Sequence, residues 1–211
     1  ETKKEARNTL EISFMRSFTE GIRYVRKEPT TRALLILTMV PAIFVIPFTT
    51  GLMPVFAEDV VHVGPDGLGI LLMAFGTGSL IGPLLIAGRP DIPHRGVVIL
   101  LSAGMGGVAL IALSQTSNML IAMLVLVPAG IAMMLYHTLT NTTLQILTPD
   151  EFRGRVTSLY MMDHGLVPLG SVIAGALAQA WGAPTAILIG GVACTVVVAM
   201  ASVRYEIVRR L

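Results

Sequence analysis

Two small groups of polar residues lie inside long apolar stretches of this chain. Asp163 adjoins His164 in one stretch, and His137 stands four residues before Asn141 in another. A carboxylate at the centre of a membrane helix costs about 2.5 to 3.5 kcal/mol, so Asp163 should face the interior of a helix bundle or carry a proton. Because histidine titrates near neutral pH, these four residues are candidates for a substrate or proton pathway.

Hydrogen bonding between helices is an alternative role for the same residues. Gln145 follows Asn141 after four more positions, so His137, Asn141 and Gln145 form one polar stripe on a helix. Stripes of this kind also join neighbouring helices within a membrane. Both roles remain open for these side chains.

The surroundings of Asp163 predict a local disturbance of its helix. Pro168 has no amide hydrogen, which frees the carbonyl of His164 four residues earlier. Helical periodicity places His164 on a face shared with Tyr160 and Ser171. We therefore expect the polar residues of this stretch to gather at an irregular point in the helix.

The composition identifies the solvent of these stretches as lipid. Hydrophobic residues make up 54% of the chain and charged residues only 13%, compared with about 25% in soluble domains. About 20 apolar residues are needed for a helix to cross the hydrocarbon core. The sequence predicts an all-α membrane protein, a bundle of six transmembrane helices at about Thr31–Phe56, Gly67–Ala87, Gly96–Leu113, Met119–Leu147, Val156–Trp181 and Pro184–Val203.

The basic residues predict the orientation of this bundle. All 15 Lys and Arg residues lie before or at the very start of the first stretch, in two alternate loops, or in the C-terminal tail. The first of the other loops carries Glu58, Asp59 and Asp66. Because positive charge is retained in the cytoplasm, both termini are expected there. The net charge of +2 then reflects topology and gives no argument for nucleic-acid binding.

An N-terminal segment of different character precedes the bundle. Apolar residues recur at helical spacing within residues 8–28 and charged residues occupy the other faces, which predicts an amphipathic helix on the inner membrane surface. A soluble helix that docks on the cytoplasmic loops is the alternative. The expected organisation is a cytoplasmic linker with this helix at 1–30, the transmembrane bundle at 31–203 and a cytoplasmic tail at 204–211.

Proline and glycine predict irregular and closely packed helices in the first two stretches. Each proline in the first stretch removes an amide donor, so that helix should bend or break at Pro41, Pro47 and Pro54. Small residues in the second stretch permit close approach of another helix. These helix-packing candidates are Gly69, Gly78, Gly82 and Pro83.

Several motifs carry a family resemblance over nearly the whole chain. The most specific is the run Gln-Ile-Leu-Thr-Pro-Asp-Glu-Phe-Arg-Gly-Arg-Val at 145–156, supported by the segments at 20–26, 67–69 and 158–175. The sequence resembles a bacterial exporter subgroup of the major facilitator superfamily that contains enterobactin exporters and macrolide efflux proteins. The resemblance implies that the six stretches correspond to the seventh to twelfth helices of a twelve-helix transporter.

The resemblance also gives a meaning to the loop between the second and third stretches. Arg89, Asp91 and Arg95 occupy the place of the superfamily's cytoplasmic acid-and-base loop, whose charges hold the transporter closed on that side. The motif is degenerate here, and a solvated loop that obeys the charge rule is the alternative. The glycine spacing of the second stretch is similar to an antiporter motif that normally belongs to the fifth helix.

These observations predict half of a secondary active transporter in the bacterial cytoplasmic membrane, a proton-coupled exporter of small amphipathic molecules of drug or siderophore type. Such transporters need two six-helix bundles, so we expect a fragment or a half that pairs with a missing N-terminal half or a second six-helix chain. A non-transporting scaffold or assembly subunit is the alternative. An enzyme is disfavoured: we expect neither metal nor cofactor, and Cys194 is the only cysteine.

Overall fold

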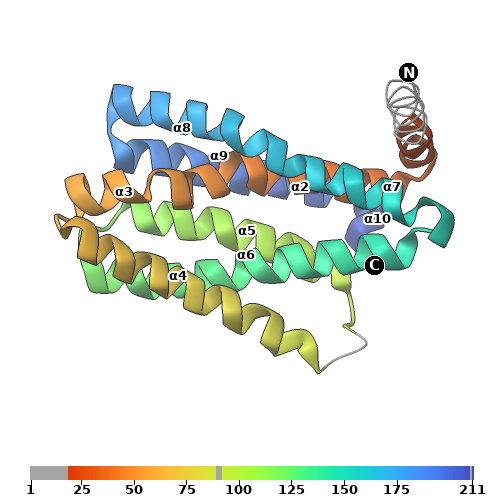
Figure 1. Ribbon diagram of the computed structural model, residues 1–211, viewed down its shortest axis with the longest axis horizontal. Coiled ribbons are helices and arrows are strands. Elements are labelled where there is room, and N and C mark those ends of the chain that lie inside the picture. The colour runs from red at the N-terminus through yellow and green to blue at the C-terminus, as the bar shows by residue number, and fades with distance from the viewer. Residues whose placement is uncertain (1–18, 89–91, 210) are drawn as a thin grey trace, which may run out of the picture.

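The protein is a bundle of antiparallel helices (Figure 1). The computed structural model describes residues 19–88, 92–209 and 211, and these contain six helical stretches that are long and apolar enough to cross a membrane, with no strand. The predicted fold class is confirmed. In chain order the helices are α2 (Pro29–Phe44), α3 (Met53–Val55), α4 (Gly64–Ala87), α5 (Arg95–Ser114), α6 (Met119–Leu147), α7 (Asp150–Met161), α8 (Val167–Trp181), α9 (Ala183–Arg204) and α10 (Glu206–Arg209).

The first membrane-spanning stretch is broken near Pro47 and Pro54, as predicted, whereas α2 continues through Pro41. Helix α2 ends at Phe44 and a π-helical turn follows at Pro47–Gly51, beginning at a proline. After the short α3, a second π-helical turn occupies Phe56–Val60. Because proline cannot donate to the preceding turn, the hydrogen bonding shifts to a wider spacing at these points. This stretch therefore contains two irregular turns in its second half.

Helices α4 and α6 form the most extensive helix pair in the bundle. A Cβ atom added at Gly78 would lie 1.9 Å from the Val127 carbonyl oxygen, and one at Gly82 would lie 2.7 Å from that of Ile131. Both glycines thus allow two backbones to touch. Gly69 takes no part in this contact, because its Cβ position has no other atom within 4 Å.

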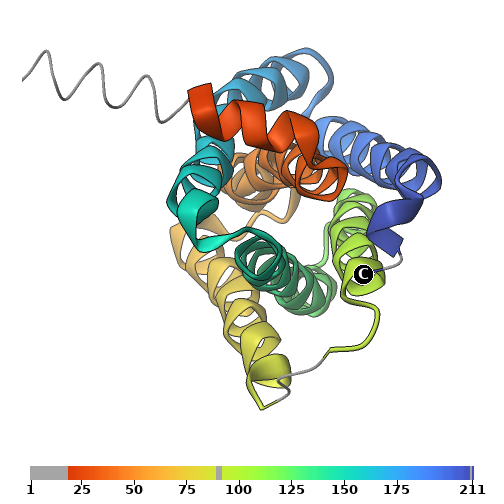
Figure 2. The ribbon, with the colours of Figure 1, turned by 90° about the vertical axis from the view of Figure 1, so that its right-hand side faces the viewer.

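Residues 19–27 are helical and lie across one end of the bundle (Figure 2). Arg155 on α7 forms an ion pair of 2.9 Å with Glu20, and the rings of Tyr24 and Phe152 stack with their centroids 4.6 Å apart. This described part of the expected amphipathic helix therefore contacts α7. Residues 8–18 of that expected helix lie outside the described residues.

Segments that carry basic residues gather at one end of the molecule, which we call the basic end. Figure 1 shows residues 19–27, the beginning of α7 and α10 on its right-hand side. The turn that contains Glu58 and Asp59 lies at the opposite end, near α3. The separation of charge expected from the sequence is therefore present along the long axis of the bundle.

Candidate substrate and proton site

Asp163 lies where the fifth membrane-spanning stretch departs from α-helical geometry. A 3-10 turn at Met162–Leu166 separates α7 from α8, and Pro168 is the second residue of α8. The carbonyl of His164, which this proline frees, accepts the amide hydrogen of Val167 in the tighter hydrogen bond of the 3-10 turn. The irregular point expected beside Asp163 is therefore a single tight turn.

The Asp163 carboxylate is buried and paired with an exposed imidazole. Asp163 is 4% exposed, whereas the His164 side chain is 66% exposed. Their atoms Oδ1 and Nδ1 are 2.6 Å apart. An ionised carboxylate only accepts hydrogen bonds, so Nδ1 of His164 carries the hydrogen when Asp163 is charged. The pair joins the interior of the bundle to its surface.

His137 on α6 faces the same pair. Its ring centroid lies 6.4 Å from that of His164, and its Nδ1 is 3.1 Å from the hydroxyl oxygen of Tyr160 on α7. The structure thus brings Asp163, His164 and His137 together from two different helices and adds Tyr160 to them.

Asn141 lies at the edge of this cluster. Its side chain interacts with the Tyr160 hydroxyl and accepts a hydrogen bond from Nε2 of Gln145. The polar stripe on α6 is therefore partly joined within its own helix. Asn141 is bonded within its own helix on one side, and it approaches the Asp163 cluster through Tyr160 on the other.

The geometry of the cluster suits a proton path with one gap. A carboxylate, two imidazoles and a phenol can each accept or release a proton. The separation of 6.4 Å between the two histidine rings is too long for a direct hydrogen bond. A proton that passes between them needs a bridging water molecule or a rotation of the exposed His164 ring.

Three buried hydroxyl groups on α6 were missed in the sequence. Tyr136, Thr140 and Thr143 are at most 3% exposed. The hydroxyl groups of Tyr136 and Thr140 lie near each other, but none of the three oxygens has a partner at hydrogen-bond geometry within the described part of the chain. Their spacing of four and three residues places them on one face of α6. This helical spacing is the feature of the sequence from which the group could have been predicted. Since buried hydroxyl groups are normally bonded, these oxygens mark candidate positions for water in the bundle.

Other predicted positions lie apart from the cluster. Ser171 is exposed, and its hydroxyl donates to the Val167 carbonyl at 3.0 Å, so the expected common face of Tyr160 and Ser171 does not hold across the 3-10 turn. Of the expected gate loop, Arg95 begins α5 at the basic end. Arg89 and Asp91 lie outside the described residues. No group of three or more metal-ligating side chains occurs among the residues that the structure describes.

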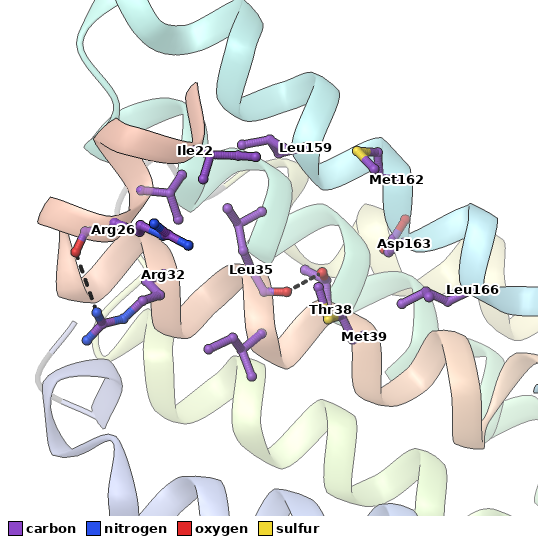
Figure 3. A pocket seen from close by; sticks show the side chains of 12 residues that line it. Ile22, Arg26, Arg32, Leu35, Thr38, Met39, Leu159, Met162, Asp163 and Leu166 are labelled. Atoms are coloured by element: carbon purple, nitrogen blue, oxygen red, sulfur yellow. Dashed lines mark hydrogen bonds between the residues drawn. The ribbon is translucent and has the colours of Figure 1, made fainter. Parts of the chain in front are cut away.

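A cleft of about 370 Å³ reaches Asp163 from the basic end (Figure 3). Its walls come from residues 19–27, α2, α7 and the 3-10 turn. Arg26 and Arg32 lie at one end of the cleft, and Asp163 and Leu166 lie toward the other. The buried Asp163 carboxylate is therefore accessible through this cleft as well as beside the exposed His164 ring.

Comparison with known proteins places this architecture in a family. The sequence profile of a family described as transmembrane secretion effectors matches residues 1–209 of this chain. The chain is also 27% identical over 177 residues to the multidrug efflux pump Tap of Mycolicibacterium fortuitum, an alignment that covers 83% of this chain and 43% of that protein. The chain thus spans less than half the length of this relative. No solved structure gives a significant match. The multi-pass membrane chain belongs to the transmembrane secretion effector family of the major facilitator superfamily.

Proposed function

We propose that this chain forms the C-terminal six-helix half of a proton-coupled exporter of small amphipathic molecules in the bacterial cytoplasmic membrane. The observation that carries the proposal is the buried Asp163, paired with His164 and close to His137 at the break in the fifth span. Intramembrane ionisable groups of this kind serve proton relays in transporters. In this arrangement Asp163 exchanges the coupling proton, and His164 connects it to water.

The need for a second bundle is supported by the exposed faces of two spans. Only 22% of the most apolar window of Gly64–Ala87 and 17% of that of Asp150–Trp181 are buried. In major facilitator proteins, transport depends on two six-helix halves that rock around a site between them. We propose that the missing N-terminal half, or a second six-helix chain, covers these two spans. The relative named as a multidrug efflux pump is more than twice as long as the aligned region, which supports this arrangement.

Reconstitution tests the proposed function directly. The complete protein in liposomes is expected to move a cationic amphipathic dye against its gradient when a proton gradient is imposed, whereas the isolated 211-residue chain is expected to give no transport above protein-free liposomes. Fluorescence of the dye measures both. Transport by a monomer of the isolated chain would contradict the half-transporter proposal, and a complete protein that folds but moves none of several amphipathic dyes would contradict the exporter proposal.

Single-cysteine labelling tests the proposed orientation. Ser117, between α5 and α6, and Glu151, at the start of α7, are both exposed but lie at opposite ends of the bundle. In sealed cells, an impermeant maleimide is expected to label Ser117→Cys and to leave Glu151→Cys unlabelled until the cells are opened. Cys194 is fully buried and should contribute little background. The reverse labelling pattern would show that the chain has the opposite orientation in the membrane.

A further inference from the structure

We propose that the cleft bordered by residues 19–27, α2 and α7 binds one anionic phospholipid. The phosphate lies between Arg26 and Arg32, and one acyl chain extends along the cleft toward Asp163. This inference goes beyond the proposed transport function and does not depend on it. It rests on the walls of the cleft, the charge at its mouth and its direction of opening.

Three of the four elements that form the cleft supply apolar side chains near its mouth. Ile22 and Val25 belong to the helix at 19–27, Leu35 and Met39 to α2, and Leu159 to α7 (Figure 3). The ion pair between Glu20 and Arg155 and the stacked rings of Tyr24 and Phe152 hold the first of these elements against α7. The cleft is therefore built by tertiary contacts of the docked helix.

The mouth of the cleft carries two arginines, Arg26 and Arg32, that meet no acidic partner among the described residues. Arg26 and Arg32 are exposed, and Nη1 of Arg32 donates to the Arg26 carbonyl oxygen at 3.5 Å, which keeps these two residues close. Among the described ion pairs, neither guanidinium meets a carboxylate. Guanidinium groups bind phosphate through parallel hydrogen bonds. The mouth therefore favours an anionic headgroup.

The cleft runs from the basic end into the apolar part of the bundle, as a lipid chain does within one leaflet. Arg32 lies in the first turn of α2, at the basic end, and Met39 follows seven positions later, about 10 Å further along the helix axis. Ile36 and Met39 are 41% and 45% exposed, so the cleft is open along the side of α2. An anionic lipid fits both the charged mouth and the apolar length of the cleft, because its headgroup lies at the membrane surface and its acyl chain lies in the hydrocarbon. A free phosphate would fill the mouth only.

The test measures lipid preference of the complete protein in nanodiscs. In phosphatidylcholine nanodiscs with a minor fraction of spin-labelled phosphatidylglycerol, electron paramagnetic resonance reports the immobilised lipid and its preference over spin-labelled phosphatidylcholine. Each arginine near an anionic lipid contributes about fivefold to binding. The double variant Arg26→Gln/Arg32→Gln is therefore expected to lower the preference for phosphatidylglycerol by about tenfold or more.

A matched double variant separates a site from general attraction to the membrane surface. Arg23→Gln/Lys27→Gln removes the same amount of charge from residues 19–27 beside the cleft, but these two residues do not line it. This variant is expected to lower the preference clearly less than Arg26→Gln/Arg32→Gln does, because it removes no guanidinium that binds the phosphate at the site. Equal losses in the two double variants would overturn the proposal in favour of diffuse surface charge.

Filling the apolar part tests for the acyl chain. Met39→Trp keeps every charge and narrows the cleft, so the preference for phosphatidylglycerol is expected to fall severalfold; Met73→Trp, at an exposed position on α4, is its control. Thermal unfolding checks that all variants are folded. Full retention in Met39→Trp, or displacement of the lipid by soluble glycerol phosphate, would overturn the lipid site and indicate a site for phosphate alone.

Discussion

Export by the complete transporter is expected to fall to the level of protein-free liposomes when Asp163 is replaced by asparagine. The amide has nearly the same shape as the carboxylate, but it cannot carry the coupling proton or the charge that pairs with His164. Because the fold is expected to survive, the amount of purified protein and its unfolding temperature should change little. Dye transport driven by an imposed proton gradient measures the loss.

Three further variants serve as controls for Asp163→Asn and test the two histidines. Ser171→Ala removes a hydroxyl group that bonds only within α8, and it should transport normally. His164→Gln and His137→Gln should alter the pH dependence of transport if these residues relay protons, because histidine is the group that titrates near neutral pH. Full activity in Asp163→Asn with an unchanged pH profile would place the coupling proton elsewhere in the complete protein.

The second large effect is expected at the contact between α4 and α6. In Gly78→Ala, the new methyl group would lie 1.9 Å from the Val127 carbonyl oxygen, and backbone cannot yield as a side chain does. The two helices must separate, and overpacking of this kind costs about 1 to 3 kcal/mol or more. We expect a clear fall in the unfolding temperature in detergent and a low yield of folded protein.

The same helix provides the control. Gly76 is exposed, and its Cβ position has no other atom within 4 Å, so Gly76→Ala adds the same methyl group in open space. Alanine favours helix over glycine by about 0.5 to 1 kcal/mol in water, so this variant should be neutral or slightly stabilising. Equal unfolding temperatures for the two variants would show that the α4–α6 contact contributes little to stability.

The membrane-spanning stretches could be predicted from the sequence because lipid imposes a simple length requirement. About 20 apolar residues are needed for each crossing, and the stretch expected at Met119–Leu147 coincides with α6. The break in the first stretch followed from the chemistry of proline, since Pro47 begins a π-helical turn. These features depend on local composition and do not require knowledge of the neighbouring helices.

The contacts between elements could not be predicted in the same way. Periodicity alone placed Tyr160 and Ser171 on one face, because it assumed a continuous α-helix through the 3-10 turn. It also predicted a packing role for Gly69 as well as for Gly78. Gly78 faces the backbone of α6, whereas Gly69 has no other atom near its Cβ position. Asp163 was found from its cost in lipid, whereas its proximity to His137 depends on how α6 and the fifth span pack.

The 3-10 turn at Met162–Leu166 also sets the angular register of the fifth span. A 3-10 residue advances about 120° and 2.0 Å, and an α-helical residue about 100° and 1.5 Å. Over these five residues the difference is roughly a quarter of a revolution and about 2.5 Å of length. If the turn relaxed to α-helix, α8 would rotate by that angle about the axis of the span and move toward α7 by that length. The axis of that rotation would pass beside Asp163, so this turn also sets which residues of α8 face the rest of the bundle.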